Sequence, residues 1–393
     1  MNQGANRLIL EGRFLVNIAG AIIRQDALRP VRGNIDWERM FRFADYHRVA
    51  NMVYLGMLGK GDNIPERWRD LFFDRYVQGL LYKDSCETAE QEILTLLDVS
   101  GIPCTILESS RIHNLYQIQE MAYRNPLKLW IGKDNYSLVK GYMVDQGYVT
   151  TFTYKGFGER MKHSSGFQLE IYYELPFHTK FYKKNMMQIL NYAYIKEPYK
   201  HVRALSVDKQ FVWMMAQCVY HYVLDELRIR EVLDLYLYYK TWHEQINMEY
   251  IKKAWDSFRI DEVAKMLLAL SYMWFGSVEE LAPEQRAEDM SAYDIMENRI
   301  LSRTPTGRET NQQAIALEKC IRKELDKETR KERYQRRKEK WKEKWDGFMR
   351  QVTWMFPGYK YMRTMYPVLE YIPILLPAFW LVRLLRFLIG RIA

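Results

Sequence analysis

The sequence has few cysteines, and their spacing argues against cysteine-rich classes of protein. There are 4 cysteines in 393 residues, and no two of them form a C-x-x-C pair. Four widely spaced cysteines in a chain of this length do not suggest a disulfide framework. The zinc-protease motif H-E-x-x-H is missing too, because His243-Glu244 is not followed by a second histidine. Together with the lack of a secretory signal pattern, these features predict a cytoplasmic location.

Long apolar runs are also missing. A membrane-spanning helix needs about 20 apolar residues in succession. The apolar segment Leu15–Ile23 is much shorter and follows Glu11 and Arg13, which predicts an ordinary helix. Residues 371–393 are hydrophobic overall, but two prolines and three arginines interrupt them. We therefore predict no membrane-spanning helix in either region.

Hydrophobic and basic residues, in contrast, are abundant. Hydrophobic residues make up 48% of the chain and aromatic residues 15%, which is enough for a substantial core. The length suggests about two or three domains. The net charge of +9 suits an acidic partner such as anionic lipid or nucleic acid, but charge alone does not choose between them.

The middle of the chain has the pattern of a small mixed α/β core. Short apolar or β-branched runs predict strands, and an amphipathic segment closed by glycine predicts a helix. A polar break after the first strand opens an apparent helix that reaches about Gln117. The predicted strands are Ile102–Leu107, Leu127–Ile131, Tyr148–Tyr154 and Gly166–Leu175, and the predicted helix is Asp134–Gln146, followed by a turn at Lys155–Gly158.

These elements resemble the core of the nucleotidyltransferase superfamily. In particular, they resemble an uncharacterised bacterial nucleotidyltransferase-like family with a helical C-terminal half. The resemblance covers about residues 10–250 and again the hydrophobic tail. It implies an α+β fold in which a small mixed-sheet nucleotidyltransferase core is embedded in a largely α-helical chain. The matching core positions are Ile102-Pro103, Leu107, Leu115-Tyr116, Leu129–Ile131, Tyr136, Gly147-Tyr148 and Leu169–Ile171.

The positions that carry the family's chemistry hold other residues here. The family's Lys-Gly falls on Glu108-Ser109, and its Gly-Asp-x-Asp falls on residues 125–128, so that Pro126 and Lys128 replace the two aspartates. Aspartates at i and i+2 of a strand point to one face, and with a third carboxylate they hold Mg²⁺ against nucleotide phosphates. Only that third carboxylate, Glu170, remains. We predict a dismantled metal site with no intact catalytic residue, in which Glu170 is at most a single ligand.

The family has a cation at the position of Glu108 and an anion at the position of Lys128, so the two charges are exchanged in this chain. We hypothesise that the Lys128 ammonium takes part of the vacated metal position and pairs with Glu170, Glu108 or both, since a lone buried charge is costly. The alternative is that Lys128 reaches out to solvent.

Helices are predicted on both sides of the core. The resemblance places His47 on an N-terminal helix, Asp36–Asn51, and Asp234 on a C-terminal element, and we interpret both side chains as structural. Asp234 is expected to orient Arg228 or Arg230. The predicted regions are an N-terminal helical region (1–100), the core (101–200), a C-terminal helical bundle (201–275), a linker or insertion (276–315), a charged helix (316–348) and a basic hydrophobic tail (349–393).

The C-terminal region has two distinct patterns. In the charged helix Glu and Lys or Arg recur at i,i+4, which predicts a long solvated helix, and the interleaved acids argue against nucleic-acid binding. In residues 371–393 leucines and arginines fall on opposite sides of a helix, which predicts an interfacial helix on an anionic membrane. The alternative is docking on the protein itself. The residues predicted to meet the membrane are Trp380, Leu381, Arg383, Leu385, Arg386 and Leu388.

Three functions are open at this point. The first, which we favour, is a catalytically degenerate nucleotidyltransferase-family protein that binds a nucleotide or a partner protein and needs no cofactor. The second is an active transferase with a non-standard metal site, which would use Mg²⁺ and a nucleoside triphosphate and draw on Asp134, Asp145 or Glu159. The third is a peripheral membrane adaptor anchored by its C-terminal helix.

Overall fold

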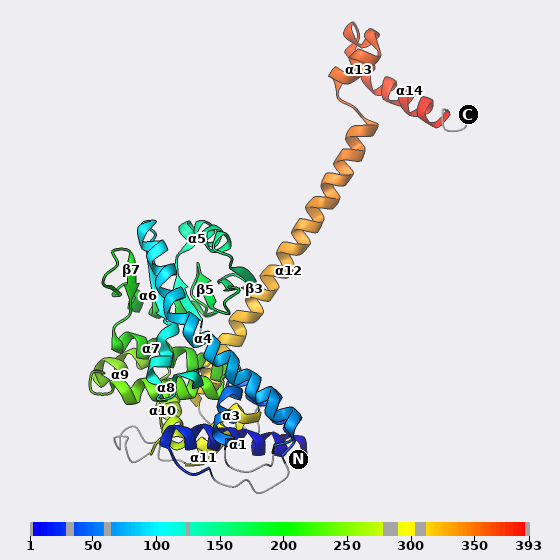
Figure 1. The fold of residues 1–393 in the computed structure, drawn as a ribbon. Coiled ribbons are helices and arrows are strands. Elements are labelled where there is room, and N and C mark those ends of the chain that lie inside the picture. The colour runs from blue at the N-terminus through cyan, green and yellow to red at the C-terminus, as the bar shows by residue number, and fades with distance from the viewer. Residues whose placement is uncertain are drawn as a thin grey trace. The chain divides into compact units, whose positions relative to one another are not determined.

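The chain folds into two compact units, Met1–Arg322 and Lys323–Ala393 (Figure 1). A computed structural model describes residues 3–28, 35–58, 64–122, 126–277, 290–302 and 312–389. A mixed sheet lies among many helices in the first unit, which confirms the predicted α+β class.

A seven-stranded sheet forms the centre of the first unit, with strand order β3-β4-β5-β2-β1-β7-β6. β2 runs antiparallel to β1 and parallel to β5, so three strands that are distant in the sequence lie side by side. The predicted strands are all present, whereas β4, β6 and β7 were not predicted because they are short and partly polar. The bounds are β1 Cys104–Glu108, β2 Leu127–Trp130, β3 Val149–Tyr154, β4 Gly158–Lys162, β5 Gln168–Tyr172, β6 Tyr194–Ile195 and β7 Val202–Ala204.

Gly158 begins β4 at a point where the prediction placed the end of a turn. A Cβ atom at this position would lie 2.0 Å from the carbonyl oxygen of Ile171 on β5, so only glycine allows the two strands to pair here. We expect Gly158→Ala to lower the free energy of unfolding by about 2 kcal/mol, because the strands must separate locally. Urea denaturation tests this against Gly141→Ala, a helical position with open space around it, which is expected to be neutral or stabilising. Equal stabilities of the two variants would contradict the expectation.

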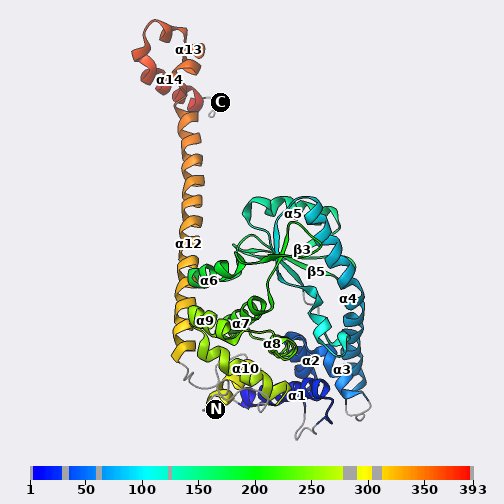
Figure 2. The same ribbon diagram turned by 90° about the vertical axis from the view of Figure 1, so that its left-hand side faces the viewer.

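One face of the sheet packs on two helices. α4 (Glu66–Val99) and α5 (Lys133–Asp145) supply Leu97 and Val139 to a core that includes Leu129 and Ile171 of the central strands. Figures 1 and 2 both show α5 on one side of the sheet and α7 to α10 on the other. Alternation along β2 and β5 therefore turns their remaining side chains toward the helical half.

The helical half combines C-terminal and N-terminal elements. The C-terminal helices are α7 (Val207–Val223), α8 (Ile229–Trp242), α9 (Met248–Phe258) and α10 (Asp261–Phe275), and the N-terminal ones are α1 (Gln3–Arg24), α2 (Trp37–Tyr46) and α3 (Ala50–Met57). Another helix, α6 (Lys180–Leu190), follows the sheet strand β5.

Two predicted helices have other bounds or another form. The single helix predicted at 36–51 breaks between α2 and α3, because Arg48 adopts a left-handed backbone with φ 57°. The helix predicted after the first strand is a pair of 3-10 turns, η1 (Ser110–Leu115) and η2 (Gln119–Met121).

The stretch 276–315 was predicted as a linker or insertion, and its described part is different. Residues 290–302 form α11 (Met290–Ser302), which contacts α1 and α10. Met296 and Leu301 are buried there, so this segment belongs to the core of the first unit. The sequence suggested a linker here because the acids Asp294 and Glu297 lie in an otherwise polar and acidic stretch. Residues 278–289 and 303–311 lie outside the described residues.

The second unit begins within α12 (Gln312–Met355), which is longer than the charged helix predicted at 316–348. Its tail contains α13 (Tyr359–Met365), the 3-10 turns η5 (Pro367–Glu370) and η6 (Pro373–Leu375), and α14 (Leu376–Ile389). Within the described ranges, no helix is both long and apolar enough to cross a membrane.

Candidate functional site

Four side chains of alternating charge form a row across four neighbouring strands. Glu108 of β1 stands opposite Lys128 of β2, Lys128 stands opposite Glu170 of β5, and Glu170 stands opposite Arg160 of β4. We call Glu108, Lys128, Glu170 and Arg160 the charge row. It lies on the sheet face that is turned toward the helical half, since the alternate residues of β2 and β5 fill the core below.

The first pair in the charge row joins Lys128 to Glu108. The Lys128 Nζ lies 2.6 Å from Glu108 Oε2, and the two side chains are only 16% and 15% exposed. The hypothesis of an ion pair is therefore confirmed for Glu108, and the alternative that Lys128 reaches out to solvent is wrong. Ser109, next to Glu108, is turned away from the row and donates to both carboxylate oxygens of Glu90 on α4.

Glu170 has four donors around its two oxygens. Its Oε1 accepts from the Tyr154 hydroxyl and from Arg160 Nε, both at 2.7 Å, and lies 2.6 Å from Arg160 Nη2. Its Oε2 accepts from the Tyr172 hydroxyl at 2.6 Å. The residue is 1% exposed. Sequence reasoning missed Arg160 and Tyr154. The only signal for them is the alternation of side chains along their strands, which points both residues to the face that carries Glu170.

These contacts fix the charges in the row. Burial alone would raise the pKa of Glu170, but Lys128, Arg160 and the two tyrosine hydroxyls lower it to about 2. Burial would lower the pKa of Lys128, whereas Glu108 and Glu170 raise it above its usual value. Burial raises the pKa of Glu108 against the opposing effect of the Lys128 ammonium. Glu170 and Lys128 are therefore held in their charged forms, and the ion pair with Lys128 opposes the effect of burial on Glu108.

The residues at this position do not fit a Mg²⁺ ion. Such a site needs several carboxylate oxygens with free lone pairs around one point. Here Lys128 already neutralises Glu108, both oxygens of Glu170 are engaged, and the buried Pro126 offers no ligand. Among the described residues no group of three His, Cys, Asp or Glu side chains is placed to hold a metal.

A second polar cluster faces the row from α8. Arg230 is 1% exposed, and its Nε donates to Asp234 Oδ1 at 3.0 Å while its Nη1 donates to the carbonyl of Met121 at 2.7 Å. The guanidinium lies 4.3 Å from the centre of the Tyr116 ring, and the Tyr116 hydroxyl also bonds Asp234. The predicted role of Asp234, to orient a neighbouring arginine, is confirmed for Arg230. The Arg230 Nη2 finds no hydrogen-bond partner in the described part of the chain.

The break between α2 and α3 holds His47 and Arg48, and Arg48 brings one more cation to the polar cluster. His47 is fully buried, and its Nδ1 accepts the amide hydrogen of Ile229 at the start of α8, which fits the predicted structural role. Arg48 follows it and is half-buried. Burial lowers the pKa of Arg48, and the nearby Arg228 lowers it further.

Two adjoining hollows lie between the charge row and the helices. The smaller one, of about 40 Å³, is lined by Arg48, Lys128 and Arg230 together with Glu108, Glu231 and Asp234. The larger one, of about 230 Å³, is mainly apolar and is lined by side chains that include Ile106, Tyr194, Leu205 and Tyr238. Both hollows share Glu108, Ile112 and Met214, so they adjoin each other, and we call the two together the cleft.

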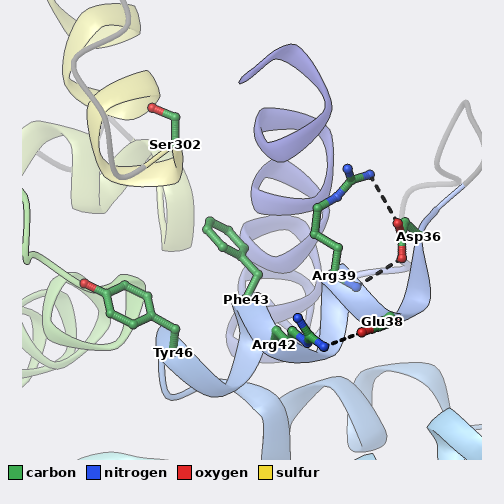
Figure 3. A pocket seen from close by; sticks show the side chains of 7 residues that line it. All are labelled: Asp36, Glu38, Arg39, Arg42, Phe43, Tyr46 and Ser302. Atoms are coloured by element: carbon green, nitrogen blue, oxygen red, sulfur yellow. Dashed lines mark hydrogen bonds and ion pairs between the residues drawn. The ribbon is translucent and has the colours of Figure 1, made fainter. Parts of the chain in front are cut away.

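A larger pocket of about 450 Å³ lies elsewhere, beside α2 (Figure 3). Its cations are already neutralised, since Arg42 pairs with Glu38, and Arg39 pairs with Glu11 and lies 4.0 Å from Asp36. Figure 3 shows Arg39 turned toward Asp36 and Arg42 turned toward Glu38. The cleft, in which a buried arginine nitrogen has no hydrogen-bond partner among the described residues, is therefore the better candidate for a ligand site.

Comparison with known protein families finds a match over the part of the chain that contains the cleft. The profile of a family described as "Uncharacterised nucleotidyltransferase" matches residues 33–276, which include the whole sheet, the charge row and α7 to α10. No curated protein and no solved structure matches the chain. Because the family match covers more than half of the 393 residues, the chain belongs to the uncharacterised nucleotidyltransferase family.

Proposed function

We propose that this family member binds a nucleotide in the cleft without a divalent metal and does not catalyse nucleotidyl transfer. The observation that carries this proposal is the position of Lys128, whose ammonium is paired with Glu108 where the resemblance places a metal-binding aspartate. In-line transfer depends on metal ions that stabilise the attacking and leaving oxygens. A single fixed ammonium neutralises charge but cannot bridge two phosphate oxygens as Mg²⁺ does.

The cleft supports binding of an anion at its polar end. Within the part of the chain that the structure describes, Arg230 Nη2 is buried without a partner, and an unsatisfied buried donor is costly unless a ligand accepts its hydrogen bond. Lys128 and Arg48 line the same hollow. A phosphate oxygen there would satisfy Arg230, because guanidinium groups bind phosphate with strong charge-assisted hydrogen bonds.

Calorimetry of the full chain with ATP tests the proposal, with Mg²⁺ in one titration and EDTA in the other. We expect binding with similar Kd in both, and no incorporation of nucleotide into any acceptor. Binding that is about tenfold tighter with Mg²⁺, or transfer that is lost in Glu170→Ala, would instead support the active alternative with a non-standard metal site.

The apolar end of the cleft offers a matched pair of variants. Tyr194 lines the larger hollow, whereas Tyr192, two residues earlier, does not line it and is 74% exposed. We expect Tyr194→Ala to weaken ATP binding by about tenfold, because stacking of a base on an aromatic ring contributes about 1–3 kcal/mol. Tyr192→Ala should leave the Kd unchanged. Equal losses in the two variants would place the base elsewhere.

A further inference from the structure

The basic excess of the protein lies entirely in its second unit. Residues 323–393 contain 17 Lys and Arg against 8 Asp and Glu, an excess of nine that equals the +9 of the whole chain. Residues 1–322, which hold the sheet and the cleft, are electrically balanced with 41 residues of each sign. The attraction to acidic partners that the composition predicts therefore belongs to the C-terminal unit and not to the nucleotidyltransferase-like core.

The same unit exposes several large apolar side chains. In the turns before α14, Tyr371 and Ile374 are each 85% exposed, and on α14 itself Leu381 and Leu385 are 63% and 57% exposed. Leu381 and Leu385 are four residues apart, so they share one side of the helix. We call Tyr371, Ile374, Leu381 and Leu385 the tail surface.

The tail is folded, so this exposure is not that of an unstructured end. Met362 and Leu369 are fully buried beneath it. Trp380, predicted to reach the headgroup layer, is half-buried and donates its indole N–H to the carbonyl of Pro357 at 3.0 Å, with its ring 5.3 Å from that of Phe356. The segment therefore turns Trp380 partly inward, while Ile374, Leu381 and Leu385 stay exposed.

On α14, Arg383 is directed away from the tail surface. The Arg383 guanidinium is 5.3 Å from the centre of the Tyr361 ring on α13, which directs it away from Leu381 and Leu385. The sole acid of the tail, Glu370, lies 4.0 Å from Arg363. The side chains of Arg386 and Leu388, also predicted to meet the membrane, lie outside the described residues.

We propose that the tail surface inserts into the interface of an anionic lipid bilayer and anchors the protein to it. Aliphatic side chains without a buried partner gain most from hydrocarbon, and basic residues beside them gain from anionic headgroups. α12 supplies the same combination, since Trp341 and Trp345 are 72% and 56% exposed among its lysines, and tryptophan favours the headgroup layer. Nucleic acid would satisfy the charge but offers no apolar medium for Ile374 and Leu385.

Flotation of the full chain with vesicles tests this proposal. One set of vesicles contains phosphatidylcholine alone, and the other contains an equal share of phosphatidylglycerol. We expect flotation with the anionic vesicles that decreases with added salt, and little with the neutral ones. Ile374→Glu with Leu381→Glu is expected to lower partition by at least about tenfold, because two charges then replace inserted apolar groups.

The matched control places the same two charges on exposed apolar residues of the first unit. Leu81 and Val99 on α4 are 64% and 82% exposed, so Leu81→Glu with Val99→Glu should float like the natural protein. Equal flotation of the two double variants, or equal flotation with neutral and anionic vesicles, would overturn the proposal. So would light scattering that shows a dimer dissociated by Ile374→Glu with Leu381→Glu, or binding of an RNA oligonucleotide where vesicles fail to bind.

Discussion

Replacement of Lys128 by methionine is expected to lower the free energy of unfolding by about 3 kcal/mol at pH 7. The variant leaves Glu108, only 15% exposed, without its cation, and removing one partner of a buried pair leaves an uncompensated charge. Glu170 stands opposite position 128 on the neighbouring strand and loses a nearby positive charge at the same time. Chemical denaturation followed by circular dichroism measures the effect.

Two further variants separate the charge from the general effect of substitution. Lys140 pairs with Glu159 at 2.7 Å but is 39% exposed, so Lys140→Met should cost less than about 1 kcal/mol. Glu108→Gln with Lys128→Met removes both charges and should recover most of the loss. A Lys128→Met variant that is as stable as Lys140→Met would show that the pair is not desolvated.

Acidification is expected to remove about 3 kcal/mol of stability through Glu170 alone. The pKa of Glu170 is about 2 in the folded protein and 4.5 as the ordinary value, so folding favours the carboxylate. The contribution is fully present above pH 4.5 and is lost as the pH falls from 4.5 through 2. A difference of about 2.5 pKa units corresponds to about 3 kcal/mol.

Glu170→Gln isolates this contribution. At pH 7 we expect the variant to be about 3 kcal/mol less stable than the natural protein, because an amide cannot replace the charge that Arg160 and the tyrosine hydroxyls engage. Near pH 2 the difference should shrink below about 1 kcal/mol. Glu226→Gln, on an exposed side chain, is the isosteric control and should stay within about 0.5 kcal/mol at both pH values. Parallel pH curves for the natural protein and Glu170→Gln would contradict the expectation.

In the charge row, the sequence predicted an ion pair of Lys128 but not the contact between Arg160 and Glu170. The resemblance aligned Glu108, Lys128 and Glu170 at the motif positions, and opposite charges within reach predicted an ion pair. It did not identify Arg160, because β4 is a short polar segment whose pairing with β5 depends on the close approach that Gly158 allows. Pairing across a sheet is a long-range contact, and no local pattern encodes which charged residues of two strands stand opposite each other.

In the C-terminal region the sequence predicted a helix but not how its side chains pack. The alternation of leucines and arginines predicted an amphipathic helix, and α14 is present. The pattern could not show that Trp380 turns inward to Pro357 while Ile374 turns outward, because η5 and η6 fold the chain back before the helix begins. Nor did the acidic composition of 276–315 reveal the buried face of α11.

By itself the sequence determined the order of β1, β2, α5, β3 and β5, the Pro126-Leu127-Lys128 segment at β2, and the amphipathic character of the tail, since all three depend on residue type and local periodicity. Only the tertiary structure decided that Lys128 pairs with Glu108, that Arg160 engages Glu170, and that a buried Arg230 nitrogen has no partner among the described residues. Those outcomes depend on which distant segments pack together and how deeply they are buried, and burial sets both the strength of each charge pair and the cost of leaving a donor unsatisfied.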